Sequence, residues 1–477
     1  MPIPQIQLVP LRAAVPANSP TLLDVLVKVI PPSLSSGNVD QKYDVGDAPQ
    51  RSTNRPRLNL SLVIDRSSSM SVKRRLVFAK AAARHIVQSL SPGDRVSVVT
   101  FDRHVQVPVP SVVIGDDPTR IVQTIESIQM GKWTNLHGGW VEGAEQVNHH
   151  IYPDTVNRVI LLTDGWPSAG VKTRSTITAH VQELAETGIS TTAVGVGHDY
   201  NEDLLEAIAT KGDGNYYYIS APEHLPQTFE REMQALIATI GQQVTLGIQP
   251  QNEADINDVL NDLELTPQGQ FKLPNLVSGY PFNIVLRLAI PALPPTFNAD
   301  TNLGEARASD LFDSDLSSSG LSSSGLPASG SSLTNSTPDH QLNLCTFRLN
   351  WTSPTGTVET PLRAFLRLPI VPLSSLNAYP PNPEVQRQVA LLLAARLKRK
   401  AINNADRKNY DAAQACLQEA KDHILDAPSS QLLELDLVAI EALEADLRSR
   451  QLRQFRKRGR NEAYQTSTGF DQISGFF

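Results

Sequence analysis

Residues 58–70 of the 477-residue chain are Leu-Asn-Leu-Ser-Leu-Val-Ile-Asp-Arg-Ser-Ser-Ser-Met. The apolar run from Leu58 to Ile64 predicts a buried strand. A polar turn follows it directly, with the spacing D-x-S-x-S, and leads into a segment of helical period. One carboxylate and two hydroxyl groups therefore stand together at the end of a strand, on Asp65, Ser67 and Ser69.

Short β-branched apolar runs alternate with longer segments of helical period between residues 57 and 240, which is typical of a doubly wound, mostly parallel α/β sheet. The expected strands are Leu58–Ile64, Arg95–Phe101, His104–Val109, Arg158–Thr163, Thr191–Val196 and Tyr216–Ile219. The expected helices are Val72–Leu90, Pro118–Gln129, His137–His149, Arg174–Thr187, Asn201–Thr210 and Pro222–Ile240. The junction after Phe101 is too short for a helical crossover, so the third strand should be antiparallel and lie at an edge.

Both flanks of this unit alternate apolar and polar residues, as antiparallel strands do. The pattern runs through residues 23–29 before the unit and through 244–248, 283–290, 345–351 and 362–370 after it. We therefore expect a β-sandwich built by both flanks, with the α/β unit inserted after its first strand. After Pro383 the period becomes helical again, which predicts a C-terminal α-helical unit that begins with an antiparallel hairpin.

These patterns give the expected division of the chain. Residues 1–56 hold the N-terminal strand of the sandwich and a loop, 57–240 the α/β domain, 241–296 and 341–376 the later parts of the sandwich, 377–460 the helical unit with its basic end, and 461–477 a tail. Residues 297–340 are rich in Ser, Gly, Asp and Asn and cannot bury enough apolar area to fold. We expect a disordered insertion there, with a phosphorylated or partner-binding tether as the alternative.

A run of basic residues ends the helical unit. Its members are Arg448, Arg450, Arg453, Arg456, Lys457, Arg458 and Arg460. The simpler interpretation is a solvated helix end whose cations suit the negative end of the helix dipole. The alternative is binding of an acidic partner or of nucleic acid.

The overall charge and the cysteines limit the class of protein. With 42 basic and 49 acidic residues the net charge is -7, so no bulk attraction to nucleic acid or anionic membrane is expected. Cys345 and Cys416 lie far apart and fit neither a disulfide framework nor a zinc site, which favours a cytoplasmic location. No basic stretch followed by an apolar run opens the sequence, and eighteen apolar residues never run together, so neither an export signal nor a membrane span is expected.

Two further oxygen-bearing residues occupy positions that the fold should bring close to Asp65. Thr134 lies in the polar loop Gly131–Leu136, and Asp164 directly follows the strand Arg158–Thr163. The carboxyl ends of parallel strands meet at one crevice, where the winding of the sheet reverses. The two acidic residues can therefore share a site with the hydroxyl groups.

At this point the chain resembles the von Willebrand factor type A family over about residues 56–240. The D-x-S-x-S turn, the Thr and the Asp match the family's metal-ion-dependent adhesion site. Further matching stretches, in family order, are Ser91-Pro92-Gly93-Asp94-Arg95-Val96, Val99-Thr100-Phe101-Asp102, Leu161-Leu162-Thr163-Asp164-Gly165, Val194-Gly195-Val196-Gly197 and Gly214-Asn215-Tyr216-Tyr217-Tyr218-Ile219.

The resemblance implies a divalent metal site in which Ser67 and Ser69 bind through their hydroxyls. Thr134 would bind directly or through water, and Asp65 and Asp164 directly or through bridging water. An all-oxygen set of this kind suits Mg²⁺, with Ca²⁺ or Mn²⁺ as alternatives. Where the family often has Gly this chain has a serine at position 68, so a left-handed backbone there would carry modest strain.

Enzyme signatures are missing from the sequence. Gly195-Val196-Gly197 lacks the third glycine of a dinucleotide turn, and no G-x-x-x-x-G-K-[ST], H-E-x-x-H or G-x-S-x-G motif occurs. A hydrolase that activates water on the metal would need a separately positioned base. We therefore expect a protein that is not an enzyme.

The expected function is a metal-dependent protein-interaction module that binds an Asp or Glu side chain of a partner protein. The alternative is an adaptor or co-subunit of a chelatase or MoxR-type AAA+ ATPase complex, because type A domains recur in such assemblies. Co-purification of an AAA+ ATPase would favour the alternative.

Overall fold

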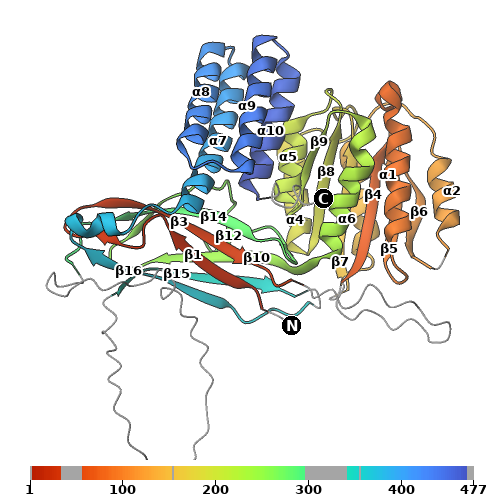
Figure 1. Cartoon of the computed structure of the whole chain (residues 1–477). Coiled ribbons are helices and arrows are strands. Elements are labelled where there is room, and N and C mark those ends of the chain that lie inside the picture. The colour runs from red at the N-terminus through yellow and green to blue at the C-terminus, as the bar shows by residue number, and fades with distance from the viewer. Residues whose placement is uncertain are drawn as a thin grey trace, which may run out of the picture.

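The computed structural model describes residues 3–33, 56–115, 117–152, 155–295, 341–353 and 356–469. These residues form an α/β domain, a β-sandwich and a bundle of helices (Figure 1). The predicted disordered insertion at 297–340 lies outside the described residues. No helix in the described ranges has both the length and the hydropathy that crossing a lipid bilayer requires.

The sheet of the α/β domain has the strand order β6-β5-β4-β7-β8-β9. Its strands are β4 (Arg57–Asp65), β5 (Arg95–Phe101), β6 (Val105–Val113), β7 (Thr155–Thr163), β8 (Ile189–Val196) and β9 (Tyr216–Ile219). Neighbours are parallel except β6, which is antiparallel to β5 at the edge. The predicted doubly wound sheet and its antiparallel edge are therefore confirmed.

Helices cover both faces of this sheet (Figure 1). One face carries α1 (Arg75–Ser89), α2 (Thr119–Glu126) and α6 (Leu225–Ile237), and the other carries α3 (Leu136–Asn148), α4 (Arg174–Glu186) and α5 (Glu202–Lys211). In β4, Leu62 and Ile64 pack on the face that α1, α2 and α6 cover, and Val63 packs on the face that α3, α4 and α5 cover, because successive strand residues point to opposite faces. This is why the central strands are nearly continuous runs of apolar residues.

Several predicted helices differ from the structure at their ends, and two of these differences have a clear physical reason. The helix expected from Val72 begins only at Arg75, because Lys73 and Arg74, at the end of the 3-10 turn Ser68–Arg74, have left-handed backbones with φ of 50° and 57°. The helix expected to run from Pro222 to Ile240 is a 3-10 turn, Pro222–His224, followed by α6, and the chain is already a strand at Thr239. That residue pairs with Val277, so sheet pairing replaces the end of the helix.

The β-sandwich consists of two sheets that enclose one core. The first has the order β1 (Gln5–Pro10), β3 (Thr21–Ile30), β14 (Phe282–Ile290), β11 (Asp255–Val259). The second has the order β12 (Phe271–Lys272), β10 (Thr239–Pro250), β15 (Gln341–Thr352), β16 (Leu362–Val371), β2 (Val15–Pro16), with β13 (Leu276–Val277) beside β10. Because β3 pairs with β14, the α/β domain is inserted in the sandwich, but three strands precede it where one was expected.

The helical bundle consists of α7 (Pro383–Asp406), α8 (Tyr410–Asp426), α9 (Gln431–Arg448) and α10 (Leu452–Ser467). Val385 and Leu392 of α7 share a small core with Leu26 and Val285 of the sandwich. Within the region expected to be a basic helix end and a tail, residues 452–467 form a further helix, α10, which lies beside α5 of the α/β domain (Figure 1).

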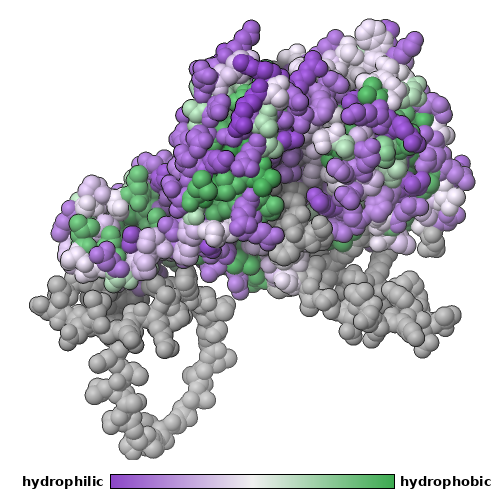
Figure 2. Space-filling view, turned by 45° about the horizontal axis from the view of Figure 1, so that its top comes forward, coloured by the Kyte–Doolittle hydropathy of each residue, from purple (hydrophilic) through white to green (hydrophobic). Residues whose placement is uncertain are grey.

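Apolar side chains also gather on the surface of the bundle (Figure 2). Leu432, Leu435 and Val438 of α9 are all exposed. Their spacing of three residues places them along one side of the helix.

Candidate metal centre

The two acidic candidates leave neighbouring parallel strands at the same end of the sheet. Asp65 is the last residue of β4, Asp164 directly follows β7, and the register pairs Ile64 with Leu162. Both carboxylates are fully buried. The carboxyl ends of the two strands therefore bring both acids together, as the sequence predicted.

A continuous series of hydrogen bonds joins the D-x-S-x-S turn to Asp164. The Ser67 backbone N–H donates to Asp65 Oδ1 over 2.8 Å, and the Ser67 and Ser69 hydroxyl oxygens are 2.9 Å apart. Ser69 Oγ in turn donates to Asp164 Oδ1 over 2.6 Å. Four of the five candidate side chains thus form one connected group of oxygen atoms.

Thr134 reaches the same group from the loop before α3. A Cβ atom at Gly165 would lie 3.6 Å from Ser69 Oγ and 3.7 Å from Thr134 Oγ1, so both hydroxyls face this glycine. The Thr134 N–H donates to Ser168 Oγ over 2.8 Å, and its carbonyl accepts from the Ser168 N–H over 2.9 Å. The structure therefore places all five candidates around one end of the sheet.

The strain considered for Ser68 is not present. Ser68 lies between the two serines of the D-x-S-x-S motif, begins the 3-10 turn and keeps a right-handed backbone. Left-handed backbones occur instead at Lys73 and Arg74, and at Trp133 beside Thr134, where φ is 69°. Non-glycine residues adopt this conformation at a cost, so the strain lies in the loops around the site rather than at the serine.

Burial controls the charge of the two carboxyl groups. It raises the pKa of Asp65 to about 7, although Thr163 Oγ1 donates to Asp65 Oδ2 over 2.5 Å. Burial also raises the pKa of Asp164, against the opposing effect of Arg75, whose Nη1 donates to Asp164 Oδ2 over 2.7 Å. Two buried acids face one guanidinium here, so a bound cation would relieve the cost of keeping both ionised.

The donor set fits a hard divalent cation. Two carboxylates and three hydroxyls supply oxygen alone, which are the ligands that Mg²⁺, Ca²⁺ and Mn²⁺ prefer. Within the described residues, no group of three or more His, Cys, Asp or Glu side chains is arranged to hold a metal. The chemistry of the five side chains therefore agrees with the ion that the sequence predicted.

Three residues that support the site were missed from the sequence. Thr163 orients Asp65, Ser168 fixes the backbone of Thr134, and Arg75 binds Asp164. Thr163 could have been noticed, because it directly precedes Asp164 at the end of β7. Arg75 is the third of three consecutive cations, and nothing in the sequence tells which of them is buried.

The β8–α5 loop packs against the guanidinium of Arg75. Gly197 has a φ of 79° and lies so close to the guanidinium that a Cβ atom would overlap it. Asp199 Oδ2 is 3.8 Å from Arg75 Nη2. The position of this loop therefore affects where the Arg75 guanidinium lies beside Asp164.

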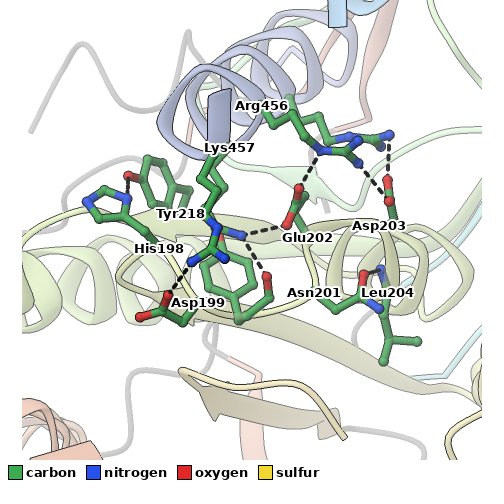
Figure 3. Close-up of polar contacts among 12 residues, drawn as sticks. His198, Asp199, Asn201, Glu202, Asp203, Leu204, Tyr218, Arg456 and Lys457 are labelled. Atoms are coloured by element: carbon green, nitrogen blue, oxygen red, sulfur yellow. Dashed lines mark hydrogen bonds and ion pairs between the residues drawn. The ribbon is translucent and has the colours of Figure 1, made fainter. Parts of the chain in front are cut away.

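Basic residues of α10 hold the other side of that loop and the start of α5 (Figure 3). Lys457 is 2% exposed and donates to the Tyr200 carbonyl over 2.7 Å and to Glu202 over 2.5 Å. Arg456 donates to the same glutamate over 2.6 Å and to Asp203 over 2.8 Å. For these residues the prediction of a solvated helix end is wrong, because their acidic partner is the chain's own α/β domain.

The sequence profile of the von Willebrand factor type A domain matches residues 59–231. The uncharacterised protein YfbK of Escherichia coli is 26% identical over 239 residues, which are 50% of this chain and 41% of YfbK. Pig inter-alpha-trypsin inhibitor heavy chain H1 is 33% identical over 165 residues, which are 33% of this chain and 18% of that protein. The matched region thus spans less than half the length of either relative.

Two solved structures share the fold over nearly the whole chain. A von Willebrand factor type A protein from Catenulispora acidiphila matches with a TM-score of 0.62 and 13% identity, over 92% of this chain and 89% of that one. The ArnB paralog VWA2 from Sulfolobus acidocaldarius matches with a TM-score of 0.54 and 17% identity, over 97% and 98%. With their D-x-S-x-S turn and doubly wound sheet, residues 59–231 of this chain form a von Willebrand factor type A domain.

Proposed function

We propose that this protein is a metal-dependent protein-interaction module that captures an acidic side chain of a partner protein. The observation that carries the proposal is the single group of oxygen atoms that Asp65, Ser67, Ser69, Thr134 and Asp164 form at one end of the sheet. Domains of this family generally mediate metal-dependent protein interactions, which supports the same conclusion.

Asp65, Ser67, Ser69, Thr134 and Asp164 would hold Mg²⁺, which when bound offers a coordination position to an outside carboxylate. Three of the five donors are neutral hydroxyls, so the protein supplies at most two negative charges. Arg75 offsets part of the charge of Asp164. The two carboxylates together do not neutralise the combined positive charge of Mg²⁺ and the Arg75 guanidinium. The site therefore retains an attraction for a further acidic group.

The rest of the chain supports a role in presentation rather than in catalysis. The α/β domain is joined to the sandwich at both of its ends, and α10 closes onto it through ion pairs. These contacts would fix the direction in which the site faces. Both cysteines are buried and free, which supports a reducing, cytoplasmic compartment.

The test is capture of partners from a native extract by the immobilised full-length chain, with Mg²⁺ or with EDTA. We expect a partner that EDTA releases and that the Asp65→Ala variant fails to capture, while Leu435→Ala, altered on the exposed face of α9, captures it normally. Capture that survives both EDTA and Asp65→Ala would refute the proposal. An AAA+ ATPase among the metal-dependent partners would specify the adaptor role.

A further inference from the structure

Two of the chain's four tryptophans border the candidate metal centre. Trp133 directly precedes Thr134, and Trp166 follows Asp164 by two residues. Trp133 is 57% exposed and Trp166 is 59% exposed, whereas the other two tryptophans are buried. Indole rings are large and mostly apolar, and they are enriched where proteins contact partners.

The backbone holds the first of these tryptophans in an unfavourable conformation. Trp133 has a φ of 69°, in the region that bulky residues rarely adopt. The next residue, Thr134, is fixed by hydrogen bonds to Ser168 and Ala169 on the loop after β7. Strained residues of this kind persist where the surroundings determine the backbone, and they concentrate at functional sites.

Exposed cations occur on the same loops as the candidate metal-binding residues. Lys73 and Arg74 occupy the loop between the D-x-S-x-S turn and α1, and Lys132 precedes Trp133. All three are exposed, although the chain as a whole has a net charge of -7. We call Lys73, Arg74, Lys132, Trp133 and Trp166 the rim.

We propose that the rim recognises the residues next to the metal-binding acid of the partner. The partner segment would carry an aromatic or large aliphatic side chain close to that Asp or Glu, and at least one further acidic residue. The indoles provide apolar faces for the first, and the exposed cations attract the second. The inference rests on the proposed function, because the rim acts on a segment that the metal site anchors.

A library of random displayed peptides tests the rim without knowledge of the partner. Peptides are selected on the full-length chain in Mg²⁺ and eluted with EDTA. We expect sequences that combine at least two acidic residues with a neighbouring Trp, Tyr, Phe or Leu. For an enriched peptide, Trp133→Ala and Trp166→Ala should each weaken binding roughly tenfold, the size of effect that interface tryptophans show.

The contribution of the exposed cations to peptide binding and the metal affinity of the tryptophan variants are measured separately. The triple variant Lys73→Ala, Arg74→Ala, Lys132→Ala should weaken binding and flatten its dependence on salt, because screened exposed charges are removed. The tryptophan variants should bind Mn²⁺ as tightly as the unaltered protein, which also shows that they fold. Leu435→Ala, an exposed apolar residue of α9, should leave peptide binding unchanged.

The outcomes separate the two proposals. EDTA-eluted peptides that bind both tryptophan variants at full strength, or that carry an acidic residue without an apolar neighbour, would overturn the rim and leave the metal-dependent function intact. Peptides that bind equally in EDTA and to Asp65→Ala would refute the proposed function itself. Selection that yields no metal-dependent peptide counts against both.

Discussion

Replacing Lys457 by methionine tests whether the buried ion pair of α10 holds the helix on the α/β domain. The ammonium group lies between the Tyr200 carbonyl and Glu202, and it sits 3.8 Å from the centre of the Tyr200 ring. Both side chains of the ion pair are at least nine-tenths buried. Methionine keeps the length of the side chain but leaves the carboxylate and the carbonyl without this donor.

The expected loss of unfolding free energy depends on which contacts Glu202 keeps after the substitution. Removal of one partner of a buried ion pair destabilises proteins by about 3–5 kcal/mol. Glu202 keeps its 2.6 Å hydrogen bond from Arg456, so we expect the lower end of that range, about 3 kcal/mol. The matched control is Arg453→Met, because Arg453 and Asp199 form an ion pair at 3.2 Å whose side chains are 81% and 56% exposed. Such exposed pairs are worth less than about 1 kcal/mol.

The assay is urea unfolding of the full-length chain, followed by circular dichroism. The double variant Lys457→Met, Glu202→Gln should recover part of the loss, since it removes the unpaired charge as well as the donor. The reasoning is refuted if Lys457→Met costs no more than Arg453→Met, or if the double variant loses the sum of the two single losses.

Three further predictions concern the core, the metal centre and the pH dependence. Gly143→Ala should lower the free energy of unfolding in urea by about 1–3 kcal/mol, because the new Cβ would overlap Val63 Cγ2. The control is Gly115→Ala, whose Cβ would meet no atom within 4 Å and which should unfold like the unaltered protein. Arg75→Met should lower the melting temperature of the metal-free protein and enlarge the rise on adding Mg²⁺, since it leaves a buried carboxylate unpaired; an equal rise in both proteins contradicts this. Burial alone would raise the pKa of Glu202, but the ammonium group of Lys457 holds that pKa below the ordinary value of 4.5. The stability that ionised Glu202 contributes is therefore complete above pH 4.5 and is lost as the pH falls through the lower pKa of the folded state. Glu202→Gln should remove this part of the dependence of the unfolding free energy on pH between pH 3 and 6.

The sequence predicted best where one local rule decides the structure. Continuous apolar runs predicted the central strands, and the short junction after Phe101 predicted that β6 is antiparallel. Because the carboxyl ends of parallel strands meet at one edge, the sequence predicted that Asp65 and Asp164 share one end of the sheet. The Ser69 hydroxyl of the turn donates directly to Asp164. The role of these residues in metal binding stays a prediction.

Features that depend on distant contacts were not predictable. Val15–Pro16 is too short to show a strand period, and it pairs only because β16 lies beside it. The basic run indicated attraction to acid, but its acid is on α5, about 250 residues earlier in the chain. The start of α1 at Arg75 depends on two left-handed residues, a conformation that neither lysine nor arginine signals.

The β8–α5 loop contacts one residue that is translated early and another that is translated much later. On one side it rests against Arg75, and on the other its Tyr200 carbonyl accepts from Lys457. Residues 57–240 leave the ribosome long before α10 does, so the nascent α/β domain must wait with this loop secured on one side alone. The full set of contacts of this loop therefore forms only after α10 has been translated.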